Sequence, residues 1–181
     1  INHRANIDAM AGAGVDAILA VCSVGTIPVD FPPGSVGYAS QYIDFTGVET
    51  TFTKSDARFT SMTKPFDQEM NNKLHSVLSN IQPGLKLDRT YWLAHGPHFE
   101  TTAEINAIEK LGGEVVGMTM PRECKLAAEL EIPYAAILVS SNWAAGREPG
   151  DSCKDLNHEE VSSTAESKLG PVVECIKAFT Q

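Results

Sequence analysis

The chain has 181 residues, of which 43% are hydrophobic and 20% charged, and its formal net charge is −9. This length supports one domain with a substantial core, and the composition is that of an ordinary globular protein. The acidic balance argues against a nucleic-acid surface or an anionic-membrane surface, because phosphate groups demand clustered Lys and Arg. A small anion can still be held locally by backbone N–H groups and hydroxyls.

Apolar spacing and turn residues predict the following elements in chain order. The segments are a helix over 5–12, strands over 15–23 and 36–45, an irregular stretch over 46–62, a helix over 67–81, a strand over 90–94, a helix over 99–111, a strand over 114–118, a helix over 122–130, a strand over 134–140, a loop over 144–157 and a helix over 158–179. Gly12 and Gly14 end the first helix, as glycines commonly do.

Strands that alternate with helices predict an α/β fold. We expect residues 1–181 to form a single-domain three-layer sandwich, with a central mixed, largely parallel sheet flanked by helices. Ligands of such sheets bind beyond the carboxyl ends of the strands. The residues that follow the predicted strands should therefore share a cleft, and they are 23–25, 95–100, 118–119 and 140–142.

The cysteines carry no metal-binding pattern, since there is no CxxC pair and no neighbouring His pair. Cys22 and Cys175 lie in apolar surroundings and are expected to be buried thiols, which favours a reducing, cytoplasmic setting. No apolar run reaches the ~20 residues of a membrane helix. The chain opens at Ile1 in helix-like pattern and without an initiator Met, so we expect a missing or removed N-terminal segment.

The segment HGPHFETTAE at 95–104 combines an aromatic ring with a carboxylate. Phe99 could stack on a flat heterocycle while Glu100 accepts a hydrogen bond from its edge. The alternatives are core packing for Phe99 and a solvated first-turn carboxylate for Glu100, which the helix dipole favours.

The predicted phosphate contacts come from two other strand ends. Thr119 offers a hydroxyl to a phosphate oxygen, although it could equally cap the helix that follows. Ser23 and Gly25 could present backbone N–H groups to an anion, or could form an ordinary turn.

Two further polar residues are candidates for substrate contacts. Asn142 has both a donor and an acceptor, which suits a purine edge, and its alternative role is that of a turn residue. His158 begins the last predicted helix, where a surface histidine is the simpler interpretation.

Together these motifs resemble those of the trimeric purine nucleoside phosphorylases, including the methylthioadenosine and methylthioinosine phosphorylase branch. The resemblance spans nearly the whole chain and rests on HGPHFETTAE, VVGMT, SQYIDFTG, ELEIPYAAILVSSN and NHEEV. The family's opening phosphate loop and its Arg and His phosphate contacts precede the region matched by Ile1. The usual proline after Met-Thr is displaced by one position in MTMPRE.

The resemblance implies a role for each candidate. Phe99 would stack on the base and Glu100 would bind its N1 edge. Asn142, or Ser141 if the alignment lacks a gap, would reach N7 and O6. The remaining contacts would be Met118 under the ribose, His158 near its 5′ position, and Thr119 with the Ser23 region at the phosphate.

The implied reaction is phosphorolysis of a purine nucleoside to free base and ribose 1-phosphate. An Asn rather than an Asp at the base edge, together with Glu100, would favour 6-oxopurines such as inosine, guanosine or methylthioinosine. The reaction needs no metal or organic cofactor, and inorganic phosphate is the co-substrate. Because the opening phosphate contacts are absent, we expect the 181-residue chain alone to be inactive or very weak. The resemblance also implies a homotrimer. The alternatives are a non-catalytic nucleoside-binding or storage relative and an N-glycosidase that uses water.

Overall fold

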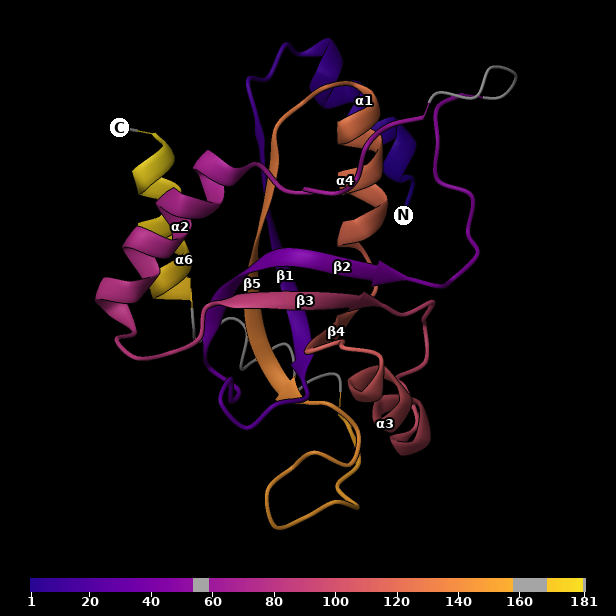
Figure 1. Cartoon of the computed structure of the whole chain (residues 1–181), viewed down its shortest axis with the longest axis vertical. Coiled ribbons are helices and arrows are strands. Elements are labelled where there is room, and N and C mark those ends of the chain that lie inside the picture. The colour runs from indigo at the N-terminus through magenta and orange to yellow at the C-terminus, as the bar shows by residue number, and fades with distance from the viewer. Residues whose placement is uncertain (54–58, 158–168, 181) are drawn as a thin grey trace.

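Five strands of mixed direction form the centre of the computed structural model, which describes residues 1–53, 59–157 and 169–180 (Figure 1). The strands are β1 (Ile18–Thr26), β2 (Val36–Asp44), β3 (Asp88–Leu93), β4 (Val115–Gly117) and β5 (Tyr134–Trp143). The helices of the described residues are α1 (His3–Gly12), α2 (Gln68–Ile81), α3 (Thr102–Lys110), α4 (Met120–Glu129) and α6 (Leu169–Phe179).

The sheet closes on itself in the order β1-β4-β3-β2-β5. The pairs β1–β5, β2–β3 and β3–β4 are parallel, whereas β1–β4 and β2–β5 are antiparallel. The predicted mixed α/β fold is therefore confirmed, but the strands form a closed barrel rather than the middle layer of a three-layer sandwich. Closure depends on which strands pair with one another, and such pairing leaves no signature in the hydrophobic pattern of a single strand.

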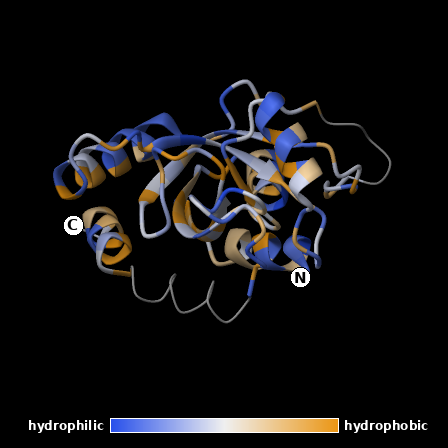
Figure 2. Cartoon of the chain, turned by 90° about the horizontal axis from the view of Figure 1, so that it is seen from below, coloured by the Kyte–Doolittle hydropathy of each residue, from blue (hydrophilic) through white to orange (hydrophobic). Residues whose placement is uncertain are grey.

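The helices lie outside the barrel with one face packed inward. α2 and α6 lie side by side on one flank, while α1 and α4 pack together on another (Figure 1). Met70, Leu74 and Leu78 form the buried stripe of α2, with the four-residue spacing of an amphipathic helix. Figure 2 shows hydrophilic and hydrophobic stretches alternating along these helices. None of the helices in the described ranges is long and apolar enough to cross a membrane.

β5 is the most deeply buried strand of the barrel. It is paired with β1 on one side and with β2 on the other, and every residue from Tyr134 to Ser141 is buried. An apolar run that is buried along its length is typical of a strand covered on both faces. The strand continues to Trp143, three residues beyond its predicted end, so that its carboxyl end carries polar side chains.

A buried arginine joins three segments near the start of β3. The Arg89 side chain is 1% exposed, and its Nη1 lies 3.0 Å from Asp30 Oδ1 and 3.2 Å from Glu114 Oε1. Its Nη2 donates to the Lys86 carbonyl at 2.7 Å, and the guanidinium lies 4.7 Å from the centre of the Phe31 ring. This cluster fixes the segment between β1 and β2, whose prolines reach the candidate site.

Candidate functional site

The carboxyl end of β5 carries the predicted base-edge residues. The register between β1 and β5 shifts after Ser140, so that Ser141 is an extra residue opposite β1. Such a bulge re-aims the side chains beside it. Asn142 Nδ2 donates to the Trp143 carbonyl at 2.7 Å, and the Asn142 Oδ1 accepts from Ser141 Oγ at 2.9 Å. The carboxamide is thus tied at both of its ends.

β1 meets this strand end at Ser23 and Gly25. Ser23 Oγ donates to Ser141 Oγ at 2.8 Å, which links two residues 118 positions apart. Gly25 lies opposite Asn142, and a Cβ at this glycine would lie 3.3 Å from Asn142 Nδ2 and 3.2 Å from Val116 Cγ1. The absence of a side chain here gives the Asn142 carboxamide its room.

The neighbouring Ser140 does not join the cleft that the sequence predicted for 140–142. It is fully buried and its Oγ lies 2.8 Å from Thr26 Oγ1, itself fully buried. Ser140 and Ser141 therefore make separate hydroxyl pairs with β1, and only the second pair contacts Asn142.

Phe99 and Glu100 lie in the segment that precedes α3. Thr101, not Phe99, begins this helix as its N-cap, and a capping box joins its side chain and backbone to Glu104. Such a reciprocal pair fixes a helix start. The prediction of a helix from residue 99, with Glu100 in its first turn, was therefore wrong by three residues.

The two side chains differ in exposure. Phe99 is 39% exposed, so it is available to stack on a ligand and is not part of the core. Burial raises the pKa of the Glu100 carboxyl, and the nearby Glu104 charge raises it further, whereas a hydrogen bond from the backbone N–H of Glu100 opposes both effects. Desolvation disfavours the charged form of an acid.

Met118 and Thr119 follow β4. Gly96 has a positive φ of 68°, and a Cβ there would lie 2.6 Å from Met118 Sδ, so the thioether packs directly on the segment that leads to Phe99. Thr119 is the N-cap residue of α4 but makes no side-chain capping bond, while its backbone N–H donates to the buried Tyr91 hydroxyl at 3.3 Å. Burial raises the pKa of the Cys22 thiol to about 12, and the Thr119 side chain opposes this shift.

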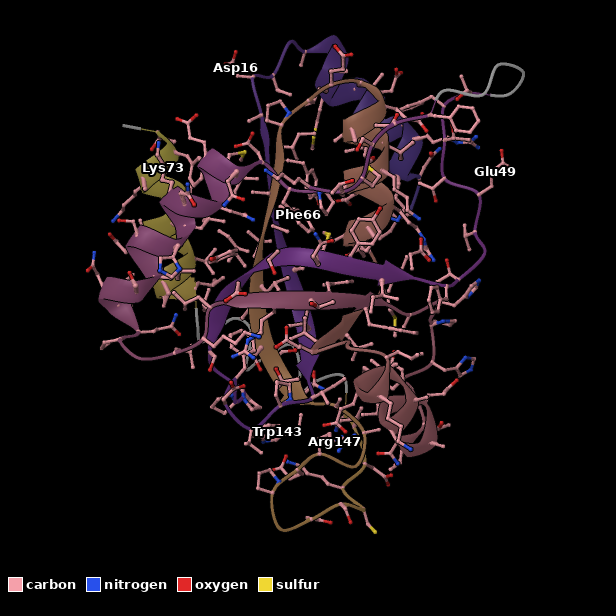
Figure 3. All side chains as sticks on the ribbon, viewed as in Figure 1. Asp16, Glu49, Phe66, Lys73, Trp143 and Arg147 are labelled. Carbon is pink, nitrogen blue, oxygen red and sulfur yellow. The ribbon has the colours of Figure 1, made fainter. Side chains whose placement is uncertain are left out.

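The loop after β5 brings the two halves of the site together. Arg147 Nη2 donates to Asn106 Oδ1 at 3.0 Å and to Glu109 Oε2 at 2.7 Å, both on α3. Gly146, with a positive φ of 76°, packs so closely on α3 that a Cβ would lie 2.6 Å from Thr102 Cγ2. Figure 3 shows Trp143 and Arg147 at the end of β5 next to α3.

Two adjoining hollows result. One, of about 320 Å³, is lined by Ser141 and Asn142, and the other, of about 760 Å³, is lined by Phe99 and Glu100. They share a wall made by Gly146 and Lys154–Leu156. The structure therefore places the predicted base-stacking and base-edge residues around neighbouring spaces, as ligand sites at strand ends require.

The other predicted contacts are distributed differently. Ser23, Met118 and Thr119 line neither of these two hollows, although Ser23 contacts Ser141 directly. His158 lies outside the described residues. The smaller hollow is also lined by residues that were not predicted as site residues from the sequence, namely Pro32, Pro33, Trp143 and Lys154. A Pro-Pro turn and a loop lysine are too common to have indicated a site.

Among the described residues, no group of His, Cys, Asp and Glu side chains is arranged to hold a metal ion. The residues around the two hollows offer hydrogen bonds and an aromatic face for stacking. A carboxamide, a carboxylate and an aromatic ring lie at the carboxyl end of a mixed α/β barrel. Groups of this kind are suited to a flat, nitrogen-rich small molecule.

Comparison with known proteins identifies the family. The model of the phosphorylase superfamily matches residues 1–179, and the chain therefore belongs to this superfamily. It is 36% identical to a 6-oxopurine nucleoside phosphorylase of Pyrococcus furiosus, over 98% of this chain and 69% of that protein. It is 34% identical to a protein named "Probable S-methyl-5'-thioinosine phosphorylase" of Thermodesulfovibrio yellowstonii, over 98% of this chain and 66% of the relative.

A solved structure gives the same fold. The methylthioadenosine phosphorylase of Schistosoma mansoni, determined in complex with adenine, superposes with a TM-score of 0.88 at 22% identity, over 98% of this chain and 68% of that one. The chain thus spans about two thirds of the length of the proteins it matches.

Proposed function

We propose that the protein catalyses phosphorolysis of purine nucleosides, with 6-oxopurine nucleosides such as inosine, guanosine or methylthioinosine as substrates. The observation that supports this most is the fixed Asn142 carboxamide at the end of β5, beside the hollow lined by Phe99 and Glu100. The relatives named as 6-oxopurine nucleoside and methylthioinosine phosphorylases support the same activity.

The two polar groups suit the base in complementary ways. An ionised Glu100 accepts the N1–H of a 6-oxopurine, whereas N1 of adenine carries no hydrogen to give. Asn142 uses one amide N–H for the Trp143 carbonyl, and we assign its other N–H to N7. Phe99, half-exposed at the larger hollow, stacks on the ring.

The reaction moves charge toward Asn142. A phosphate oxygen bonds to the anomeric carbon while the bond from that carbon to N9 breaks. The electron pair of the broken bond leaves with the base. Negative charge then spreads to N7, where a donor that is already in place lowers the barrier. Phosphate held against the sugar contributes by positioning. We assign this phosphate to Ser23 and Thr119, the ribose to Met118 and its 5′ end to His158.

The proposal needs no metal or organic cofactor, and it includes a homotrimeric assembly. Three alternatives are separated by one set of assays on the protein expressed from its complete reading frame. Release of hypoxanthine from inosine that requires phosphate supports the proposal. Release that is indifferent to phosphate would indicate an N-glycosidase, and binding without turnover would indicate a non-catalytic relative. A clear preference for adenosine would contradict the 6-oxopurine assignment. Sedimentation analysis tests the trimer.

A further inference from the structure

Three polar side chains form a continuous hydrogen-bond chain from β1 to the proposed base edge. Ser23 Oγ donates to Ser141 Oγ at 2.8 Å, and Ser141 Oγ lies 2.9 Å from Asn142 Oδ1. The β-bulge makes this possible, because Ser141 is the extra residue between the positions that pair with Val24 and Gly25. A regular strand would turn Ser141 and Asn142 to opposite faces.

The Ser141 hydroxyl has one proton and two acceptors within reach. They are Asn142 Oδ1 at 2.9 Å and the Val24 carbonyl at 3.2 Å. When Ser23 donates to Ser141 Oγ, it restricts the hydroxyl's rotation and strengthens its onward hydrogen bond, because linked hydrogen bonds polarise one another. Ser23 thereby favours the orientation of the Ser141 hydroxyl in which it donates to Asn142 Oδ1.

The orientation of the Ser141 hydroxyl determines which group of the Asn142 carboxamide faces a ligand. With Oδ1 accepting from Ser141 and Nδ2 donating to the Trp143 carbonyl, the amide cannot rotate by 180° without placing an oxygen against an oxygen. The second N–H of Nδ2 is then held in a fixed direction. An Asn has two donors and an acceptor in one plane, so fixing the plane fixes the donor.

We propose that Ser23 is a positioning residue that acts through Ser141 to orient the Asn142 carboxamide for donation to N7 of the purine. This inference rests on the proposed function, since it assumes that Asn142 meets N7. The Ser23 hydroxyl thereby has a role separate from that of the Ser23 backbone N–H, which is assigned to phosphate. Substitution by alanine would remove the hydroxyl and keep the backbone N–H.

A purely structural role for the Ser23 hydroxyl is the competing explanation, and the chain offers a matched control for it. Ser23 is exposed, so its removal leaves no cavity in the core. Ser140 makes a similar 2.8 Å hydroxyl pair between the same two strands, but it is fully buried and contacts Thr26 rather than Asn142. Loss of the Ser140 hydroxyl should therefore affect stability without affecting N7 recognition.

The test compares equilibrium binding of inosine and 7-deazainosine, in the absence of phosphate, to the protein expressed from its complete reading frame. The second ligand has a carbon at position 7 and cannot accept the Asn142 hydrogen bond. The ratio of the two dissociation constants therefore reports this bond alone. We expect Ser23→Ala to lower the ratio about fivefold, the value of one net hydrogen bond. Ser23→Thr, which keeps the hydroxyl, and Ser140→Ala should keep the wild-type ratio.

The outcomes separate the two levels of the proposal. If Ser23→Ala weakens both ligands equally, or leaves the ratio unchanged, the positioning role is wrong while the proposed reaction stands. If the wild-type protein binds both nucleosides equally well, Asn142 does not donate to N7, and the base-edge assignment falls together with the positioning role. Thermal unfolding of each variant confirms that the comparison is made on folded protein.

Discussion

Gly25 is the position where a single added methyl group tests the geometry of the site most directly. Its Cβ would lie 3.2 Å from Val116 Cγ1, 3.3 Å from Asn142 Nδ2 and 3.7 Å from the Ala144 Cα. Ordinary contact between such atoms is about 3.5–4.0 Å. In Gly25→Ala, Val116 must therefore move by roughly 0.3–0.8 Å and Asn142 by roughly 0.2–0.7 Å.

The expected loss follows from that displacement. Misplacing a catalytic group by 1 Å can cost ~100-fold in rate, so this shift of Asn142 should lower kcat/KM for inosine about three- to twenty-five-fold. The packing strain should lower the free energy of unfolding by about 1–2 kcal/mol, partly offset because alanine restricts the unfolded chain. Phosphate-dependent hypoxanthine release and urea denaturation measure the two effects.

Gly12→Ala is the control, because no heavy atom lies within 4 Å of the added Cβ in that variant. It should leave kcat/KM unchanged and should not lower the free energy of unfolding. A Gly25→Ala protein with wild-type kcat/KM would refute the reasoning, since it would mean that Asn142 either yields freely or does not take part in the reaction.

Two other substitutions probe charge. In Glu100→Gln, a charged acceptor of N1–H is replaced by a neutral amide that can also donate to the unprotonated N1 of adenine. The substitution should therefore lower the preference for inosine over adenosine, measured as the ratio of their kcat/KM values. Because burial raises the folded-state pKa of Glu100 above the ordinary 4.5, wild-type stability falls as pH rises through that value to the folded pKa. Glutamine does not titrate, so the glutamine variant does not lose stability in this way. The difference in unfolding free energy, variant minus wild type, should therefore increase as the pH rises from 4.5 to the folded-state pKa of Glu100. A difference that is independent of pH would contradict the burial of this carboxyl. Arg89→Met should lower the free energy of unfolding by about 1–3 kcal/mol in urea titrations, because the Lys86 and Asp30 carbonyls lose their donor. The exposed Lys177–Glu174 pair provides the comparison, and Lys177→Met should cost less than ~0.5 kcal/mol; equal losses would show that the Arg89 cluster is not a buried network.

The order and type of the described elements could be predicted from the sequence, because each depends on local spacing and local turns. The start of α3 could also have been predicted, since Thr101 and Glu104 form the capping pattern Ser/Thr-x-x-Glu. The prediction placed the helix start at the apolar Phe99 instead. The extension of β5 to Trp143 could not be predicted from the local sequence. Serine and asparagine have low strand propensity, and here pairing with β1 overrides it.

The sequence allowed several side chains of the site to be predicted, but not the hydrogen bonds that join them. Phe99, Glu100 and Asn142 could be singled out as chemically suited to a heterocycle. The hydrogen bond between Ser23 and Ser141 depends on a bulge and on strand register, and no local pattern encodes a pairing across 118 residues. The tether from Arg147 to α3 likewise depends on where the loop after β5 returns.

The continuous burial of β5 from Tyr134 to Ser141 has a consequence for how the two sides of the site fluctuate. The backbone of this strand is bonded to neighbours on both sides, so its amides should exchange with deuterium only when the whole domain opens. The stretch from His95 to Glu100 lies outside the barrel ladder and should exchange through small local openings. A nucleobase would thus rest against one rigid wall while the other wall adapts to it.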